Sequence, residues 1–503
     1  MPQGGNGMYI GLDIGTSGTK AALVDESGSV CRSAQVSYSF CNTRGGYREL
    51  DAREVWEAAL SCLRQVGTGS EVKTITVSAL GEAIVMIDRD GNPLAPGITG
   101  TDIRGAQELD ALRARYGVRA LTELTGQNLS TIYSANKILW IKEHEPELYE
   151  KAWKILTFQD YIIYRLCREA VIDRSMASRT LLFDINRNDW SDRLLRDLQI
   201  GREKLASVLP AGSIAGEVTR STAEAAGLPG KIKVVVGTHD HICNAIGSGV
   251  CEAGSCADTV GTTEGLTAVL GREQLSSENI EKYQISCEPF AVDGLFNTVA
   301  WNNTSGVLLR WFVNEMVREE PPEEILRTFD KMNAAMPEAP TGLFVLPHFS
   351  GAATPYMDSE SRGAVLGLTL DTKREDVYKA LMEGANYELA LILDGLVSAG
   401  LTPSKIVATG GALSPQLLQI KADVLGHAVA TVKNRQTGTL GGAILGAVAV
   451  GSYPDIPGAV QAMVQEDRVY QPDPKRCKIY REKLEIYKKI YPAIAEISHS
   501  IVQ

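Results

Sequence analysis

A hairpin near the start of the sequence combines a carboxylate with a turn rich in glycine and hydroxyl groups. Tyr9–Ile14 reads as an apolar strand broken only by Asp13, and Ala21–Val24 reads as a second strand. The turn at 15–19, Gly-Thr-Ser-Gly-Thr, can offer backbone N–H groups and hydroxyls to an anion. A carboxylate in a buried strand needs a partner, and Mg²⁺ beside a polyphosphate would be one. The hairpin therefore indicates a phosphate loop, although an ordinary glycine-rich turn would explain the same residues.

A second group of reactive side chains follows an apolar strand in the middle of the chain. This strand is predicted over Lys231–Gly237, and Thr238-His239-Asp240-His241 lies at its carboxyl end, before a helix. Open α/β sheets place their chemistry in loops at the carboxyl ends of strands. Asp240 there could take a proton from a hydroxyl. Alternatively, His239 and His241 could bind a metal ion.

The pattern of the first hairpin returns about halfway along the chain. Asp258-Thr259-Val260-Gly261-Thr262-Thr263-Glu264 precedes an apolar run to Leu270. We align it with the first hairpin by setting Asp258 against Asp13 and inserting one residue. A repeat at this spacing predicts two related lobes with one phosphate hairpin each. The boundary falls near residue 246, which gives lobes of 1–246 and 247–503.

A third glycine-rich turn lies late in the sequence. Thr409-Gly410-Gly411-Ala412-Leu413-Ser414 follows a predicted strand, Lys405–Ala408, and enters a helix with Pro415 at an early position. Glycines beside a helix N-terminus allow a nucleotide to approach the backbone closely. The small residues of Thr437–Val450 predict a helix that packs under this turn. A plain tight turn is the alternative.

Composition restricts the class of protein. The 503 residues are 44% hydrophobic and 22% charged, which is typical of soluble globular proteins. Strands alternate with helical patterns, which favours an α/β fold. The net charge of −11, without a basic tail or stripe, argues against a nucleic-acid partner. The 9 scattered cysteines form no Cys-x-x-Cys pair, and neither a signal peptide nor a membrane span is predicted. We therefore expect a cytoplasmic protein with no membrane partner.

Taken in order, these motifs resemble those of the FGGY family of carbohydrate kinases, within the actin-like ATPase superfamily. The resemblance runs from about Tyr9 to about Tyr453 and is strongest over Leu346–Gly351, Thr354-Pro355 and Arg362–Ala364. It implies an α/β fold of two actin-like (ribonuclease H-like) lobes with a nucleotide and sugar cleft between them. It also implies transfer of the γ-phosphate of ATP, with Mg²⁺, to a hydroxyl of a small sugar.

The resemblance also assigns roles to single residues. Asp240 matches the family's catalytic base, and Asp13 lies near Mg²⁺. The first phosphate loop is matched by Gly15, Thr16, Ser17 and Thr19, and the second phosphate loop by Gly261, Thr262 and Thr263. The segment flanking the nucleotide is matched by Gly306 and Arg310, and the adenosine site by Gly410, Gly411 and Ser414.

The sugar side is assigned less directly. A carboxylate suits a polyhydroxyl ligand because it accepts two hydroxyl hydrogen bonds, but Asp102 could equally form a surface ion pair with Arg104. Position 81 is glycine where the glycerol-using branch has arginine, which disfavours glycerol. We therefore expect a ketose or polyol of about five carbons, such as xylulose, and a homodimer is compatible with the resemblance. The residues expected at the sugar are Gly81, Glu82, Asp102, His239 and Asp240.

Departures from the family pattern leave other readings open. His239 and His241 replace small residues, as does Glu264 after the second loop. The histidines could bind the sugar or pack at the hinge between the lobes. One alternative function is a non-catalytic actin-like ATP-binding module. Another is a metal-dependent hydrolase that uses His239 and His241, although this would leave the paired glycine-threonine loops unexplained.

Overall fold

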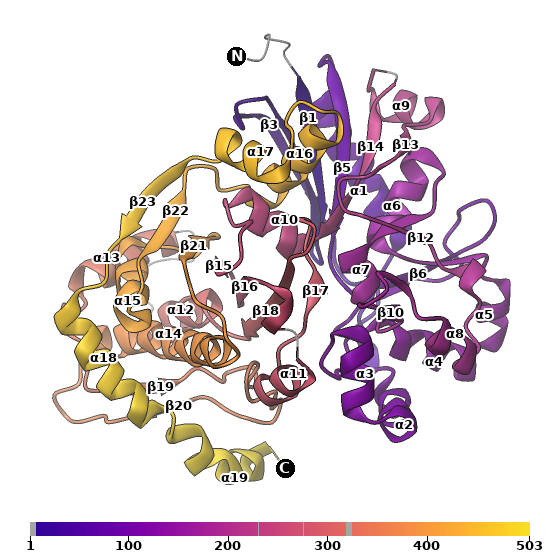
Figure 1. The fold of residues 1–503 in the computed structure, drawn as a ribbon. Helices are drawn as coiled ribbons and strands as arrows, with labels where there is room; N and C mark the ends of the chain where they lie inside the picture. Colours follow the sequence, from indigo (N-terminus) through magenta and orange to yellow (C-terminus); the bar gives the residue numbers. More distant parts are fainter. Residues whose placement is uncertain (1–6, 230, 275, 318–323, 503) are drawn as a thin grey trace.

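The structure, a computed structural model, describes residues 7–229, 231–274, 276–317 and 324–502. Two large sheets lie in opposite halves of the molecule, one formed by the indigo to magenta part of the chain and the other by its reddish, orange and yellow parts (Figure 1). Helices cover both sheets, so the predicted α/β fold with two lobes is confirmed.

The first sheet has six strands in the order β13-β14-β5-β1-β2-β3. Strands β1, β2 and β3 form an antiparallel meander, whereas β5 and β14 run parallel to β1. The parallel strands are almost completely buried, as expected for a sheet covered by helices on both faces. The bounds are β1 Met8–Ile14, β2 Gly18–Val24, β3 Val30–Ser37, β5 Val72–Ala79, β13 Ile214–Glu217 and β14 Lys233–His239.

The second sheet has seven strands in the order β17-β18-β16-β15-β21-β22-β23. Its centre repeats the first sheet, because β15, β16 and β18 form an antiparallel meander and β21 and β22 run parallel to β15. The bounds are β15 Ser255–Val260, β16 Glu264–Leu270, β17 Glu288–Pro289, β18 Phe296–Asn302, β21 Lys405–Thr409, β22 Val429–Val432 and β23 Glu466–Tyr470.

The two hairpins correspond, but the predicted alignment of their acidic residues is wrong by one position. Asp13 pairs with Lys20 and is two residues before Gly15 of the first turn. The residue two positions before Gly261 in the second turn is Thr259. Thr259, not Asp258, therefore corresponds to Asp13. Because successive residues of a strand face opposite sides of the sheet, the Asp258 side chain lies on the opposite face from that of Thr259.

Side-chain caps mark the starts of several helices. Asp51 caps α1, its side chain accepting from the N–H of Arg53, and Ser414 caps α15 in the same way through Leu417. The bounds of the larger helices are α1 Ala52–Gly67, α2 Ala106–Tyr116, α3 Val118–Thr125, α4 Ser134–His144, α6 Phe158–Cys167, α7 Arg174–Ser178, α10 Asp240–Gly247, α12 Gly306–Phe312, α13 Ile325–Ala335, α14 Arg374–Ser398, α15 Pro415–Leu425, α16 Thr437–Ala449, α17 Ile456–Met463, α18 Pro474–Tyr487 and α19 Ile490–Val502. Each helix in the described ranges is too short or too polar to cross a bilayer.

Helices α10 and α16 fill the junction between the two sheets (Figure 1). Their apolar side chains join residues of both sheets in one buried cluster, which includes Ile242 and Leu440. Helix α16 packs mainly on α10, β1 and β5, and its predicted packing under the third glycine-rich turn stays a prediction. The backbones touch: a Cβ on Gly441 would lie 1.8 Å from the carbonyl oxygen of Cys243.

Gly441→Ala should therefore destabilise the junction, because the added methyl would overlap backbone on α10 that cannot move independently. Overpacking of this kind typically costs about 1–3 kcal/mol. We expect a lower melting temperature by calorimetry, whereas Gly342→Ala, at an exposed position where a Cβ meets nothing within 4 Å, should leave it unchanged. Equal melting temperatures for the two variants would contradict the close helix contact.

Candidate active site

A cavity of about 450 Å³ lies between the two sheets and is lined by residues of both. The first half contributes Asp13 and Lys20 of the first hairpin and Asp240 at the start of α10. The second half contributes Thr259, near the end of β15, and Gly410, directly after β21. Three of the predicted site residues, Asp13, Asp240 and Gly410, thus meet in one space. The remaining lining residues are Ser33, Ala34, Gln35, His241, Asn244, Thr409, Arg435, Gln436, Thr437, Gly438 and Thr439.

Asp13 provides the clearest candidate for a cation ligand. Its carboxylate accepts a hydrogen bond from Ser78, with an oxygen–oxygen distance of 3.1 Å. Burial and the nearby charge of Asp240 raise the pKa of Asp13 to about 6, although Lys20 opposes this rise. A hard divalent cation would relieve the unfavourable negative charge, and carboxylate oxygens are the ligands that Mg²⁺ takes. The residues present therefore fit Mg²⁺.

The two predicted phosphate loops are tight turns closed by backbone hydrogen bonds. The N–H of Gly15 donates to Gly18 over 3.0 Å, and the N–H of Gly261 donates to Thr263 over 2.8 Å. The turn residues Thr16, Ser17, Thr262 and Thr263 are exposed, as an anion site requires. Thr19 differs from the expectation, because it is fully buried and its hydroxyl donates to Tyr38.

The predicted adenosine-side glycines lie where backbones approach each other. A Cβ on Gly306, at the start of α12, would lie 2.4 Å from the carbonyl oxygen of Gly261. Gly410 has φ +110°, which favours glycine, and a Cβ there would lie 2.2 Å from Val260. Gly411 faces open space, whereas the Ser414 hydroxyl is occupied as the cap of α15.

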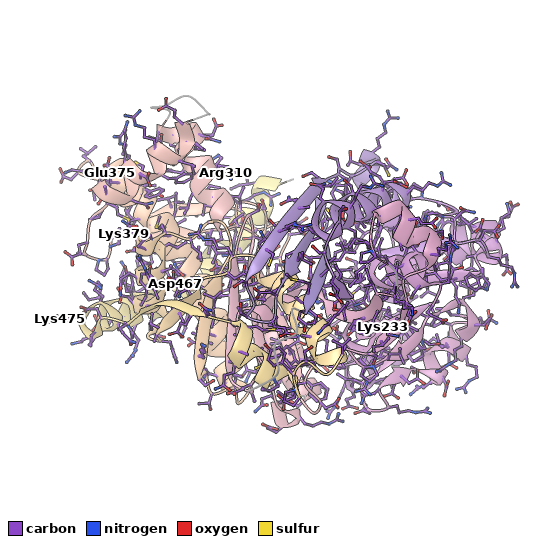
Figure 2. All side chains as sticks on the ribbon, turned by 90° about the horizontal axis from the view of Figure 1, so that it is seen from above. Lys233, Arg310, Glu375, Lys379, Asp467 and Lys475 are labelled. Carbon is purple, nitrogen blue, oxygen red and sulfur yellow. The ribbon has the colours of Figure 1, made fainter. Side chains whose placement is uncertain are left out.

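Arg310 lies on the exposed side of α12 in the second half of the molecule. Figure 2 shows it in the half opposite Lys233 and on the same side as Glu375. Neither Arg310 nor Gly306 lines the cavity described above. Their predicted place beside the nucleotide stays a prediction.

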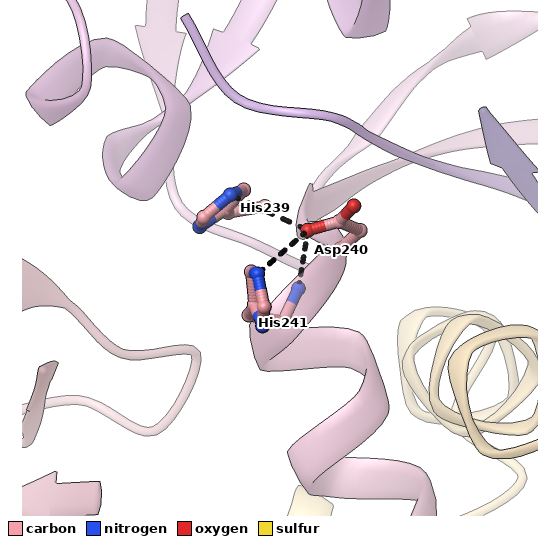
Figure 3. A group of neighbouring side chains, drawn as sticks. All are labelled: His239, Asp240 and His241. Carbon is pink, nitrogen blue, oxygen red and sulfur yellow. Dashed lines mark hydrogen bonds and ion pairs between the residues drawn. The ribbon is translucent and has the colours of Figure 1, made fainter. Parts of the chain in front are cut away.

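Asp240 begins α10, and its carboxylate lies between two histidines (Figure 3). Its Oδ1 accepts from the N–H of His241 over 2.7 Å and lies 3.3 Å from Nε2 of His239. The side chain of Asp240 is 31% exposed, so it can meet a ligand in the cavity. This is the geometry expected of a base that is oriented on one oxygen and open on the other.

The two histidines differ in their electrostatic surroundings. Burial would lower the pKa of His239, but the carboxylates of Glu288 and Asp240 outweigh burial and raise it. His241 has Asp240 as a more distant partner, with Nε2 4.0 Å from Oδ1, and burial lowers its pKa. The same cluster thus shifts the pKa of His239 upward and the pKa of His241 downward.

Gly81 lies beside His239, and the role of Gly81 and Glu82 at the sugar stays a prediction. A Cβ on Gly81 would be 2.9 Å from Nε2 of His239. Glu82 is buried at φ 64° and forms an ion pair with Arg179. A non-glycine residue in this conformation is uncommon and stores local strain, which is concentrated at functional sites.

Asp102 is placed differently from the expected sugar contact. Its oxygens accept from Arg104 Nε over 2.8 Å, from Arg104 Nη2 over 2.7 Å and from the N–H of Arg48 over 2.7 Å. Although burial opposes it, these hydrogen bonds lower the pKa of Asp102. The ion pair with Arg104 is present, but it is buried rather than at the surface. We therefore leave Asp102 out of the sugar site and treat it as structural.

The ligand atoms of His239, Asp240 and His241 all lie within 4.8 Å of one another, so they satisfy the minimum spacing of a metal site. Both ring nitrogens of His239, however, already face carboxylates, since Nδ1 lies 3.2 Å from Glu288. The trio therefore reads as a hydrogen-bonded acid-base cluster, which weakens the hydrolase alternative.

Several residues of the site were not singled out from the sequence. Lys20 could have been identified from the register of the hairpin, which pairs it with Asp13 across the turn. Asn244 is one helical turn after Asp240 and donates to Thr259 over 2.6 Å. Arg179 and Glu288 carry no local signal, because tertiary packing alone brings them to His239.

Comparison with known proteins covers almost the whole chain. Residues 8–247 match the FGGY family of carbohydrate kinases, N-terminal domain, and residues 257–450 match the C-terminal domain of the same family. A xylulose kinase of Staphylococcus xylosus is 26% identical over 486 residues, covering 96% of this chain and 99% of that protein. A gluconokinase of Bacillus subtilis is 26% identical over 493 residues, covering 95% and 94%.

The fold is also shared with solved structures. The crystal structure of a xylulose kinase from Rhodospirillum rubrum superposes with a TM-score of 0.88 at 25% identity, covering 98% of this chain and 100% of that one. The agreement extends over both sheets and the helices at their junction. The two-lobe architecture predicted from the resemblance is thus confirmed.

Proposed function

Because the chain belongs to the FGGY family of carbohydrate kinases, we propose that this sugar kinase phosphorylates a pentulose such as xylulose or a related neutral ketose or polyol. The observation that carries the proposal is the partly exposed Asp240 carboxylate, which opens on the cavity between the lobes. We also propose a lobe boundary near residue 246, a cytoplasmic location and a homodimer.

The nucleotide would occupy the side of the cavity formed by the second half. Gly410 and Gly411 leave room for adenosine near the N-terminus of α15. The turns at 15–18 and 261–263, whose hydroxyl residues are exposed, would bind the phosphates from opposite lobes. Lys20 adds a cation to the first turn. Mg²⁺, when bound, would be held by Asp13 and would neutralise phosphate charge. Phosphoryl transfer depends mainly on such alignment and charge neutralisation.

The acceptor hydroxyl would be activated by Asp240. Because all three protein contacts described above fall on Oδ1, we assign Oδ2 to the sugar hydroxyl. A carboxylate within about 2.6–3.2 Å of a hydroxyl can orient it and take its proton as the phosphoryl group arrives. A non-catalytic ATP-binding module would have no use for a carboxylate presented in this way.

The charges around Asp240 favour a neutral substrate. Glu82, Glu288 and Asp240 supply three carboxylates, whereas Arg179, and His239 when it is protonated, supply at most two cations. Each cation already faces at least one of these carboxylates. A substrate with a carboxylate of its own would need an uncompensated cation, which this cluster does not offer. The named relatives include both xylulose kinases and a gluconokinase, and this charge balance favours the xylulose type.

An ADP-release screen across pentuloses, hexuloses, polyols and aldonates tests the proposal. We expect a neutral ketose or polyol to give the highest kcat/KM. If no sugar stimulates ADP release, the assignment as a sugar kinase is overturned. If gluconate or another aldonate is the best substrate, the charge argument is wrong while the kinase assignment stands.

A further inference from the structure

His239 links the two halves of the molecule at the candidate base. It ends β14 of the first sheet, and Glu288 begins β17 of the second sheet, which packs beside α7 (Figure 1). Nδ1 of His239 lies 3.2 Å from Oε1 of Glu288, and Nε2 lies 3.3 Å from Oδ1 of Asp240. One imidazole therefore stands between two carboxylates that come from different lobes.

The surroundings hold this imidazole in one place. The N–H of His239 donates to the hydroxyl of Ser175 over 3.0 Å, which fixes the backbone. Glu288 is in turn held by Asn297, whose side-chain amide donates to Oε1 over 2.9 Å. On the open side, the ring fits only because residue 81 lacks a Cβ, which would lie 2.9 Å from Nε2 and 3.2 Å from Cδ2.

We propose that His239 is a positioning residue, held by Glu288 of the opposite lobe, that orients the Asp240 carboxylate toward the acceptor hydroxyl. The inference rests on the proposed function, because it assumes that Asp240 is the base. Nδ1 of His239 is hydrogen-bonded to Glu288, and when the ring is an imidazolium its charge attracts the Asp240 carboxylate, whose Oδ1 lies at ion-pair distance from Nε2. The orientation of Asp240 thereby depends on a contact between the lobes. Gly81 provides the space that the ring occupies.

Kinetics of Glu288→Gln and His239→Asn test the proposal. A residue that positions the base should affect turnover rather than binding. A misplacement of about 1 Å in the reacting geometry can cost about 10²-fold, so we expect kcat to fall by up to about this factor with KM for sugar and ATP within about twofold. Glu252→Gln, an exposed glutamate in the same half, is the control and should keep full activity. A raised KM at unchanged kcat would show that these side chains bind ligand instead, which would overturn the proposal.

A double-mutant cycle tests the role of Gly81. Gly81 does not have a positive φ, so alanine changes only the space beside His239. We expect Gly81→Ala to lower kcat in the wild-type background because it displaces the ring. In the His239→Ala background the same change should have little further effect, since interacting neighbours are not additive. Additive losses would contradict the proposed packing of Gly81 against the ring.

Crystal structures of the wild-type protein, Glu288→Gln and His239→Asn provide a measurement that needs no activity. We expect one orientation of the Asp240 carboxylate in the wild type. In both variants we expect the carboxylate to be rotated or to occupy two alternate conformations. If Asp240 keeps its orientation in the variants, the positioning role is wrong even where the protein is an active kinase. If no sugar is phosphorylated but Asp240 moves as expected, the proposed substrate class fails and the structural link between the lobes stands.

Discussion

Asp240→Asn should lower sugar-dependent kcat by about 10²–10⁴-fold, the contribution usually supplied by a general base. The amide keeps the size of the carboxylate, and its oxygen can still accept from the N–H of His241, so the start of α10 should be preserved. What it loses is the capacity to take the proton of the acceptor hydroxyl. ADP release measured at saturating sugar and ATP gives the effect directly.

The control for this variant is Asp110→Asn, an exposed aspartate on α2 whose only described ion pair is with Arg113. It should leave both kcat and the melting temperature unchanged. Asp240→Asn should also bind ATP with near-normal affinity, because the phosphate loops lie on other elements. Normal turnover by Asp240→Asn would remove this residue from the chemistry.

Lys421→Met should cause the largest loss of stability. Lys421 of α15 is fully buried and forms ion pairs with Asp258, at 2.7 Å, and with Glu264, which directly follows the second phosphate loop. Removing one partner of a buried ion pair typically costs about 3–5 kcal/mol, because a charge is left without compensation. Calorimetry should show a strongly lowered melting temperature at pH 8. Lys405→Met, which removes an exposed ion pair with Glu466, should have little effect.

The deficit of Lys421→Met should shrink as the pH falls. Burial and the charge of Glu264 raise the pKa of Asp258 to about 7 even with Lys421 present, and removing Lys421 should raise it further. The folded variant then binds a proton that the unfolded chain releases, so its stability decreases as the pH rises through the folded pKa. The gap from wild type should therefore be smaller at pH 5 than at pH 8. A gap independent of pH would argue against an uncompensated Asp258.

Local patterns in the sequence were sufficient for the elements and for much of the site. Glycine-rich turns between apolar runs located both hairpins, and Pro415 at an early helical position located the start of α15, because these signals act over a few residues. The alignment of the two hairpins failed by one residue because it matched acidic residues. Strand register, which places Asp13 opposite Lys20 and Thr259 opposite Gly265, depends on pairing that the matching of acids ignored.

Contacts between distant segments could not be read from the sequence. Glu288 reaches His239 from the other lobe, and Lys421 neutralises Glu264 from a helix more than a hundred residues later. Thr19 was expected at the phosphates, but the alternation of the strand turns it into the core. Such placements follow from packing of whole elements, so only a structure reveals them.

The central claim is that this chain phosphorylates a neutral sugar with Asp240 as base. Phosphorus NMR of a reaction with ATP, Mg²⁺ and xylulose, compared with the same reaction with gluconate, tests it most directly. We predict stoichiometric ADP and a new phosphate monoester with xylulose or a related neutral ketose or polyol, much less with gluconate, and neither with Asp240→Asn. ADP formation without a sugar phosphate, or equal product from Asp240→Asn, would contradict the claim.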